Sequence, residues 1–117
     1  MQYKIIKSPN YSVNTRKKAT IKFLIIHYTG MQSKRASILR LTSLKSKVSC
    51  HYLIDREGKT IQLVRDNKIA WHAGKSQWKN FKKLNENSIG IELVNKGHSF
   101  GYQTFTKKQI SKLEKLC

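Results

Sequence analysis

The stretch FLIIHYTG, residues 23–30, places four apolar residues directly before His27. An uninterrupted apolar run of this length predicts a buried β-strand, here within residues 21–28, that ends at a Thr-Gly break. A histidine at the end of such a strand has two interpretations. It is either an imidazole that is hydrogen-bonded at the strand end, or a ligand or catalytic group, because open sheets place their sites at the carboxyl ends of strands.

Strand patterns and helix patterns alternate along the rest of the chain. A hairpin is predicted over residues 48–64, with its turn at residues 55–58, and a second core strand, SIGIELV, over residues 88–94. Helices are predicted within residues 33–47 and 105–117, and the second begins with a Thr106/Gln109 capping box and an apolar stripe of Ile110, Leu113 and Leu116. Residues 66–87 are predicted to be irregular. The fold class is therefore mixed α/β, with a central mixed β-sheet flanked by helices.

The composition predicts a single basic domain. The chain has 117 residues, with 24 Lys and Arg against 6 Asp and Glu and a net charge of +18. This imbalance indicates an anionic partner, such as nucleic acid, an acidic membrane or an anionic wall polymer. Residues 1–20 are predicted to form a basic arm and residues 21–117 the folded domain. Neither a signal-peptide pattern nor a membrane-spanning run is found, which favours a cytoplasmic location.

The histidines form no local metal motif. They lie too far apart for HExxH, so any metal site would have to combine distant segments: His27, His51, His72 and His98. His98 lies in a glycine-flanked loop and is expected to be solvated. Cys50 and His51 are neighbours on a strand, and neighbouring side chains point to opposite faces, which excludes a dyad between them. Cys50 is interpreted as a small buried residue.

Two further stretches are candidates for chemistry. Glu92 shares its strand face with Gly90, whose missing side chain leaves room for another group to approach. It is either an ordinary outward carboxylate or a general base whose pKa is raised in a groove of low dielectric constant. In AWHAG, residues 70–74, the indole of Trp71 either forms an apolar wall for a ligand or anchors the loop to the core.

Four motifs carry a resemblance to a known family. FLIIHYTG, KVSCHYLIDREGKTIQLV, IAWHAGKSQW and LNENSIGIELVN occur in this order. They resemble the zinc-dependent N-acetylmuramoyl-L-alanine amidases of the AmpD/AmiD-like group, related to phage T7 lysozyme and the peptidoglycan recognition proteins. The resemblance implies a Zn²⁺ site at one end of the sheet. It also implies cleavage of the amide between N-acetylmuramic acid and the L-alanine of the stem peptide, in peptidoglycan or muropeptides.

The resemblance also implies roles for individual residues. His27 matches the first zinc ligand, and Glu92 matches the glutamate that helps to activate the zinc-bound water. Cys50 stands where the branch related to T7 lysozyme has a mechanistic tyrosine. The implied substrate-binding residues are Ala70 and Trp71 on the groove loop, and Lys47 and Lys83, which stand where the family often has arginines for stem-peptide carboxylates.

The remaining zinc ligands of the family are expected beyond Cys117, so the chain is interpreted as an amidase-like domain that is truncated at its C-terminus. The first hypothesis is an amidase. The alternative is a non-catalytic peptidoglycan-binding remnant of an amidase. A basic nucleic-acid-binding protein ranks third, and nucleic acid is not the expected partner. Truncation predicts that the apolar face of residues 106–117 and the zinc end of the sheet are partly uncovered.

Overall fold

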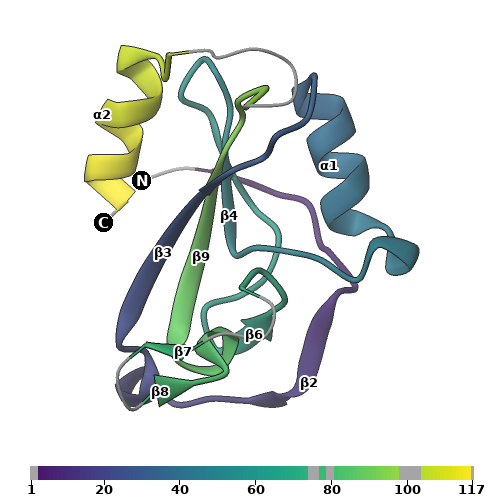
Figure 1. The fold of residues 1–117 in the computed structure, drawn as a ribbon, viewed down its shortest axis with the longest axis vertical. Helices are drawn as coiled ribbons and strands as arrows, with labels where there is room; N and C mark the ends of the chain where they lie inside the picture. Colours follow the sequence, from purple (N-terminus) through teal and green to yellow (C-terminus); the bar gives the residue numbers. More distant parts are fainter. Residues whose placement is uncertain (1–2, 74–76, 79–80, 98–103, 117) are drawn as a thin grey trace.

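The fold has three layers. The computed structural model describes residues 3–73, 77–78, 81–97 and 104–116. A central sheet separates the helices α1 (Lys34–Thr42) and α2 (Lys107–Leu116), which lie on opposite sides of it (Figure 1). This arrangement confirms the predicted α/β class with a central sheet flanked by helices.

The central sheet is mixed, as predicted. Its strand order is β1-β5-β4-β9-β3, formed by Lys4–Ile5, Thr60–Gln62, Tyr52–Ile54, Ser88–Leu93 and Phe23–Tyr28. Strand β9 pairs in parallel with both β3 and β4, while β4 and β5 form the predicted antiparallel hairpin. The register of β3 and β9 pairs His27 with Glu92. Both residues therefore lie at the carboxyl end of the sheet.

Each face of the sheet has its own apolar core, because successive residues of β9 point to opposite sides. The cluster on the α1 side contains Leu41, Cys50, Leu53, Ile61, Leu63, Val64, Ala70 and Val94. The cluster on the α2 side contains Tyr52, Ile54, Ile89, Ile91 and Leu93, and Leu113 and Leu116 of α2 pack against it. The predicted alternation of β9 is confirmed, and it places Glu92 on the α1 side, with Val94.

Both helices begin with a side-chain cap. Ser33 accepts a hydrogen bond from the backbone N–H of Ala36 at 3.0 Å. At α2 the predicted capping box is confirmed, because Thr106 N donates to Gln109 Oε1 at 3.1 Å and Gln109 N donates to Thr106 Oγ1 at 3.0 Å. The predicted apolar stripe of α2 is only partly correct. Ile110 is 38% exposed, whereas the polar Gln109 is fully buried and donates to the carbonyl of Val94.

The N-terminal residues are paired with later segments. Strand β1 extends the central sheet beside β5, and β2 (Tyr11–Thr15) pairs with β6 (Lys68–Ala70). The division of the chain at residue 20 stays a prediction. The irregular structure predicted for residues 66–87 is wrong in part, because this region contains β6 as well as the paired strands β7 (Gln77–Trp78) and β8 (Phe81–Lys82). Such short strands have no readable sequence period and depend on their pairing partners.

The outward face of the edge strand β3 is apolar and open. Leu24, Ile26 and Tyr28 are 48%, 50% and 51% exposed. The expected exposure of the apolar face of α2 is not found for Leu113 and Leu116, which pack against the sheet. The uncovering of the zinc end of the sheet stays a prediction. Within the described part of the chain, neither helix has the length and hydropathy needed to cross a membrane.

Candidate active site

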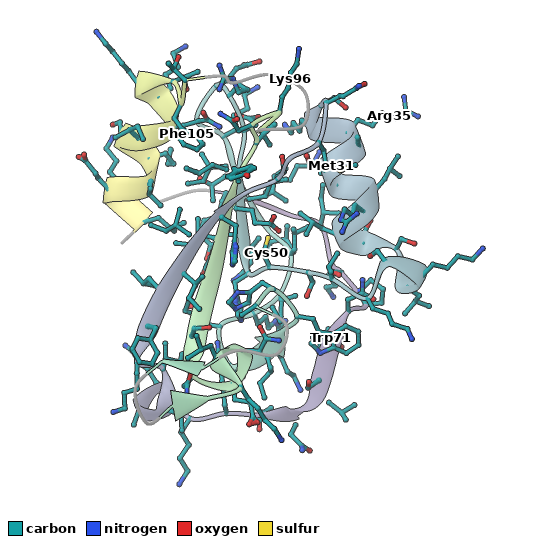
Figure 2. The ribbon with its side chains drawn as sticks, viewed as in Figure 1. Met31, Arg35, Cys50, Trp71, Lys96 and Phe105 are labelled. Atoms are coloured by element: carbon teal, nitrogen blue, oxygen red, sulfur yellow. The ribbon has the colours of Figure 1, made fainter. Side chains whose placement is uncertain are left out.

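A cleft opens at the carboxyl ends of β3 and β9, beside α1. Its volume is about 370 Å³, and its lining comes from His27, Tyr28, Thr29, Gly30, Met31, Ser37, Arg40, Leu41, Val48, Ser49, Trp71, His72 and Glu92. Figure 2 shows Met31 next to the start of α1 and Trp71 below this helix, with Cys50 between them in the interior. The cleft thus brings His27, Trp71 and Glu92 together, three residues that the sequence singled out.

Glu92 has the electrostatics of a general base. Burial raises the pKa of its carboxyl from 4.5 to about 7, although a hydrogen bond from Cys50 and the positive charge of Arg40 both act to lower it. The interpretation as an ordinary outward carboxylate is therefore not supported. A carboxyl group with a pKa near 7 exchanges protons readily at neutral pH, as acid–base catalysis requires.

Cys50 is fully buried and supports Glu92 rather than acting as a nucleophile. Burial raises the pKa of its thiol well above the ordinary value. The sulfur lies 3.2 Å from the carbonyl oxygen of Tyr52 and also contacts Glu92, so its single proton can serve one acceptor at a time. The interpretation of Cys50 as a small buried residue is confirmed.

Three of the four histidines converge at the site. His27 Nε2 lies 3.3 Å from His72 Nδ1, and the ring centroids of His51 and His72 are 6.0 Å apart. Burial is the main reason that the pKa of His27 is lowered and that those of His51 and His72 fall to about 4 and about 3. All three rings are therefore neutral at physiological pH. His98 lies outside the described residues.

The ring of His72 occupies the space that Gly90 leaves open. A Cβ atom on residue 90 would lie 2.6 Å from Cγ and Cδ2 of His72, so a larger residue would collide with the ring. Asn85 fixes the loop, because its Oδ1 accepts hydrogen bonds from the backbone N–H groups of His72 and Ala73 at 3.1 and 2.8 Å. The group that approaches Gly90 is thus a side chain of the protein itself.

His51 has a structural role beneath the cleft. Its Nδ1 accepts a hydrogen bond from the backbone N–H of Gly90 at 3.0 Å, so in the neutral ring Nε2 carries the proton and donates to the carbonyl of Lys68 at 2.8 Å. Both nitrogens are therefore engaged with the backbone. Cys50 and His51 bind different partners, in agreement with the exclusion of a dyad.

The residues expected to bind substrate lie in different surroundings. Trp71 lines the cleft, and its Nε1 donates to Ser12 Oγ at 3.1 Å, which anchors the indole. Ala70 is fully buried in the core. Lys47 and Lys83 are exposed, adopt positive φ angles of 54° and 55°, and do not contribute to the cleft lining. Their roles stay predictions.

Arg40 is a cationic residue of the cleft that no sequence pattern indicated. It lines the cleft from α1 and acts electrostatically on Glu92. Its guanidinium group offers the planar donor pair that suits a carboxylate ligand, which Lys47 and Lys83 lack. Its helical position gave no signal, because Arg40 stands among other basic residues of the same helix. Only the packing of α1 over the sheet identifies it.

The donor chemistry at His27 fits one ligand of a zinc ion. Zinc binds neutral imidazole, and burial keeps His27 in this form. Within residues 3–73, 77–78, 81–97 and 104–116, no group of three or more His, Cys, Asp or Glu side chains is arranged to hold a metal.

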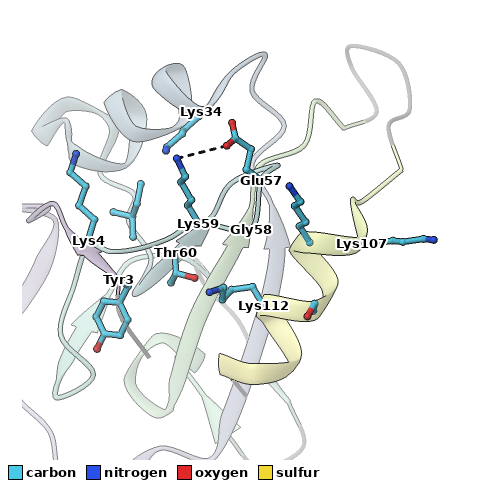
Figure 3. Close-up of a pocket in the computed structure, with 12 residues that line it drawn as sticks. Tyr3, Lys4, Lys34, Glu57, Gly58, Lys59, Thr60, Lys107 and Lys112 are labelled. Carbon is cyan, nitrogen blue, oxygen red and sulfur yellow. Dashed lines mark ion pairs between the residues drawn. The ribbon is translucent and has the colours of Figure 1, made fainter.

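A second and larger hollow lies between the β4–β5 turn, β1 and α2. Its volume is about 860 Å³, and lysines dominate its lining: Lys4, Lys34, Lys59, Lys107, Lys108 and Lys112. We call this hollow the lysine groove. Figure 3 shows Lys112 reaching from α2 toward the strand side, and the ion pair of Lys59 with Glu57 at 3.8 Å. The lysine groove shares no lining residue with the cleft.

Comparison with known proteins identifies the family of the chain. Residues 17–117 match the family described as N-acetylmuramoyl-L-alanine amidase. The amidase AmiD of Escherichia coli is 38% identical, over 80% of this chain and 37% of the relative. A putative N-acetylmuramoyl-L-alanine amidase of Rickettsia conorii is 31% identical, over 92% of this chain and 39% of the relative.

Solved structures show the same fold. AmpDh3 of Pseudomonas aeruginosa superimposes with a TM-score of 0.77 at 31% identity, covering 95% of this chain and 48% of that one. AmiD of Escherichia coli, in complex with the substrate anhydro-N-acetylmuramic acid-L-Ala-D-γ-Glu-L-Lys, gives a TM-score of 0.74 at 34% identity, covering 90% and 44%. The chain thus spans less than half the length of these relatives. Sequence, fold and site together show that the chain belongs to the N-acetylmuramoyl-L-alanine amidase family.

Proposed function

We propose that this chain acts in hydrolysis of the amide between N-acetylmuramic acid and the L-alanine of the stem peptide, in peptidoglycan or in muropeptides derived from it. The observation that carries the proposal is the pairing of His27 with Glu92 at the end of the sheet, where burial raises the pKa of Glu92 to about 7. Membership of the amidase family supports the reaction class.

Glu92 is the proposed general base and general acid. Near neutral pH, a large fraction of its carboxyl groups is ionised and can take a proton from the attacking water. The protonated form then gives a proton to the leaving amine of L-alanine. Arg40 contacts the same cleft and supplies a cation for a carboxylate of the stem peptide, and the anchored indole of Trp71 forms an apolar wall.

Zinc is the proposed cofactor, with the neutral imidazole of His27 as one of its ligands. A bound zinc ion supplies Lewis-acid polarisation of the scissile carbonyl. The low pKa of His27 supports this assignment, because a protonated imidazole has no lone pair for a metal. We expect metal affinity to fall in acid as His27 becomes protonated.

The proposal is tested by incubating the protein and Zn²⁺ with a purified muropeptide and following release of the stem peptide by mass spectrometry. We expect Glu92→Gln to lower kcat by about 100-fold or more, because the base is removed while its shape is kept. Glu57→Gln is the matched control, since the Glu57 side chain is 71% exposed and lies outside the cleft.

Failure of the unsubstituted protein to release any stem peptide would contradict the hydrolase proposal. Binding to intact sacculi is measured in parallel by sedimentation. Binding that persists in Glu92→Gln and His27→Ala, without release by any variant, would instead favour the non-catalytic peptidoglycan-binding alternative, in which Trp71 and Arg40 form the binding surface of the cleft.

A further inference from the structure

A chain of hydrogen bonds runs from the backbone carbonyl of Leu84, in the helical turn before β9, to His27. Ser88 Oγ lies 2.6 Å from the carbonyl oxygen of Leu84 and 3.1 Å from His72 Nε2. At the other side of the same ring, His72 Nδ1 lies 3.3 Å from His27 Nε2. We call Ser88, His72 and His27 the relay. Its first acceptor is a carbonyl oxygen, which cannot donate, and this fixes the direction of every hydrogen bond that follows.

Because the carbonyl of Leu84 only accepts, the hydroxyl of Ser88 donates to it, and the hydroxyl oxygen is left to accept from His72. The proton of the neutral His72 ring is therefore on Nε2. His72 Nδ1 then has a lone pair, which accepts a hydrogen bond from His27 Nε2–H. The proton of His27 is thus on Nε2, and its lone pair is on Nδ1.

The opposite tautomer of His27 is disfavoured by the same contacts. With its proton on Nδ1, His27 would direct the lone pair of Nε2 at the lone pair of His72 Nδ1 across 3.3 Å, in a half-buried setting. Two facing acceptors repel, and both lose their hydrogen bond. The His72 ring packs directly against Gly90, and Asn85 Oδ1 accepts a hydrogen bond from the backbone N–H of His72, which fixes the backbone that carries the ring.

We propose that His72 is a positioning residue that fixes His27 as the Nε2–H tautomer, so that Nδ1 is the metal-binding atom of His27. Among the described residues, none hydrogen-bonds to His27 Nδ1, and His27 lines the cleft. A metal-binding histidine usually donates its other ring N–H to a second group, which sets the ring orientation and raises its basicity. Here the acceptor is another imidazole. The metal part of this inference rests on the proposed function, whereas the tautomer does not.

The tautomer is tested on the metal-free protein labelled with ¹⁵N-histidine. Long-range ¹H–¹⁵N correlation spectra distinguish a protonated ring nitrogen from one with a lone pair. Near pH 7.5 we expect both His27 and His72 to carry the proton on Nε2. A His27 ring that carries its proton on Nδ1 would overturn the proposal, whether or not the protein binds zinc or cleaves any substrate.

Two substitutions of nearly equal shape separate positioning from packing. His72→Asn keeps an acceptor near the position of Nδ1, whereas His72→Leu removes it. We expect His72→Leu to give a mixture of His27 tautomers and to raise the Kd for Zn²⁺, measured with a competing chelator, by about 10- to 100-fold. His72→Asn is expected to restore the Nε2–H tautomer and most of the affinity. Equal behaviour of the two variants would assign His72 a packing role only.

Ser88→Ala tests the relay without changing either ring, and covers the case in which the His72 variants do not fold. Loss of the hydroxyl removes the acceptor for His72 Nε2–H, so both tautomers of His72 should become populated. Because His72 Nδ1 then carries a proton part of the time, both tautomers of His27 should become populated as well. We expect Ser88→Ala to shift the ¹⁵N signals of both rings. Thr42→Val is the control, because the hydroxyl of Thr42 donates to the carbonyl of Ile38 on α1, outside the relay. Unchanged His27 signals in Ser88→Ala would overturn the proposal.

Discussion

The cleft and the lysine groove differ in almost every respect. The lysine groove is more than twice as large, at about 860 Å³ against about 370 Å³, and six lysines line it. The cleft contains neutral imidazoles and a carboxyl group with a pKa of about 7, each held by neighbouring groups. In the lysine groove, by contrast, Lys59 pairs with the exposed Glu57 at 3.8 Å, and Lys34 pairs at 2.8 Å with Asp55, which lies outside the groove lining.

This difference shows why size and charge are poor guides to a catalytic site. A solvated lysine keeps its ordinary chemistry, because water screens it and its side chain moves freely. A buried carboxyl or imidazole changes its proton affinity, because the charged form loses hydration. The smaller cavity is therefore the one in which the protein has altered the chemistry of its side chains.

The largest expected effect is at Glu92 and concerns stability. Its carboxyl has a pKa of about 7 when folded and 4.5 as the reference value, so the unfolded chain loses this proton first as the pH rises. Stability should therefore fall between about pH 4.5 and pH 7. The difference between the two pKa values corresponds to a loss of about 3 kcal/mol in the free energy of unfolding. Glu92→Gln should restore this free energy at pH 8 and have no such effect at pH 4.5.

Urea unfolding at both pH values measures this effect. Glu57→Gln is again the control, since its exposed carboxylate is expected to change the free energy of unfolding little at either pH. A Glu92→Gln variant that is no more stable than the unsubstituted protein at pH 8 would show that the carboxyl is not destabilised by burial. In that case, burial would not explain why the side chains of the cleft differ in proton affinity from those of the lysine groove.

Gly90→Ala is the second test, because it puts a methyl group where the His72 ring lies. The new Cβ would approach the ring carbons to 2.6 Å, and contacts with Ser88 and His27 hold the ring in this position. We expect the free energy of unfolding to fall by about 2 kcal/mol, as is typical of overpacking. In a His72→Ala background the same substitution should cost much less. Equal costs in both backgrounds would contradict the steric explanation.

Acid sensitivity is the third test and depends on His51 and His72. Burial is the main reason that the pKa of His51 is lowered from 6.5 to about 4 and that of His72 to about 3. The unfolded chain therefore binds the proton first as the pH falls, and stability is lost below about pH 6.5. His51 alone should remove about 1.4 kcal/mol by pH 5.5. The measurement uses Glu92→Gln, in which the opposing titration of Glu92 is absent. Constant stability from pH 6.5 to pH 4 would contradict it.

The sequence predicted the elements that carry long or periodic patterns. The apolar run before His27, the alternation around Glu92 and the Thr106/Gln109 capping box are local signals, and each of these elements is found in the structure. The missing side chain of Gly90 also predicted correctly that another group approaches the strand at this position. The sequence could not show which group fills that space, because His72 comes from a loop distant in the chain.

The relay and Arg40 were missed for the same physical reason. Parallel pairing brings β3 and β9 together across more than sixty residues of sequence. The loop of His72 is held beside them by Asn85, a residue that no sequence pattern distinguishes. Arg40 reaches the cleft only because α1 packs on that face. Lys47 and Lys83 were predicted from the family resemblance alone. A resemblance assigns a residue to a position in a motif, but it does not predict where the side chain points.

The smallest expected effect is in the lysine groove, at the first turn of α2. Lys108 and Lys112 are four residues apart on one helix, where like charges repel, and Lys108 also lies near the positive end of the helix dipole. Lys108→Glu replaces both unfavourable interactions with favourable ones. We expect a higher Tm at low ionic strength and a loss of this gain in 0.5 M salt, because exposed charges are screened.

Lys115→Glu is the matched control, since it puts the same charge at the other end of α2, where the dipole disfavours a carboxylate. It should leave Tm unchanged or slightly lower. If both substitutions raised Tm equally, relief of the high net charge of +18 would be the cause, and the local field of the helix would not matter. In either case, the pKa of Glu92 should not change, because the lysine groove and the cleft share no lining residue and solvent screens the distance between them.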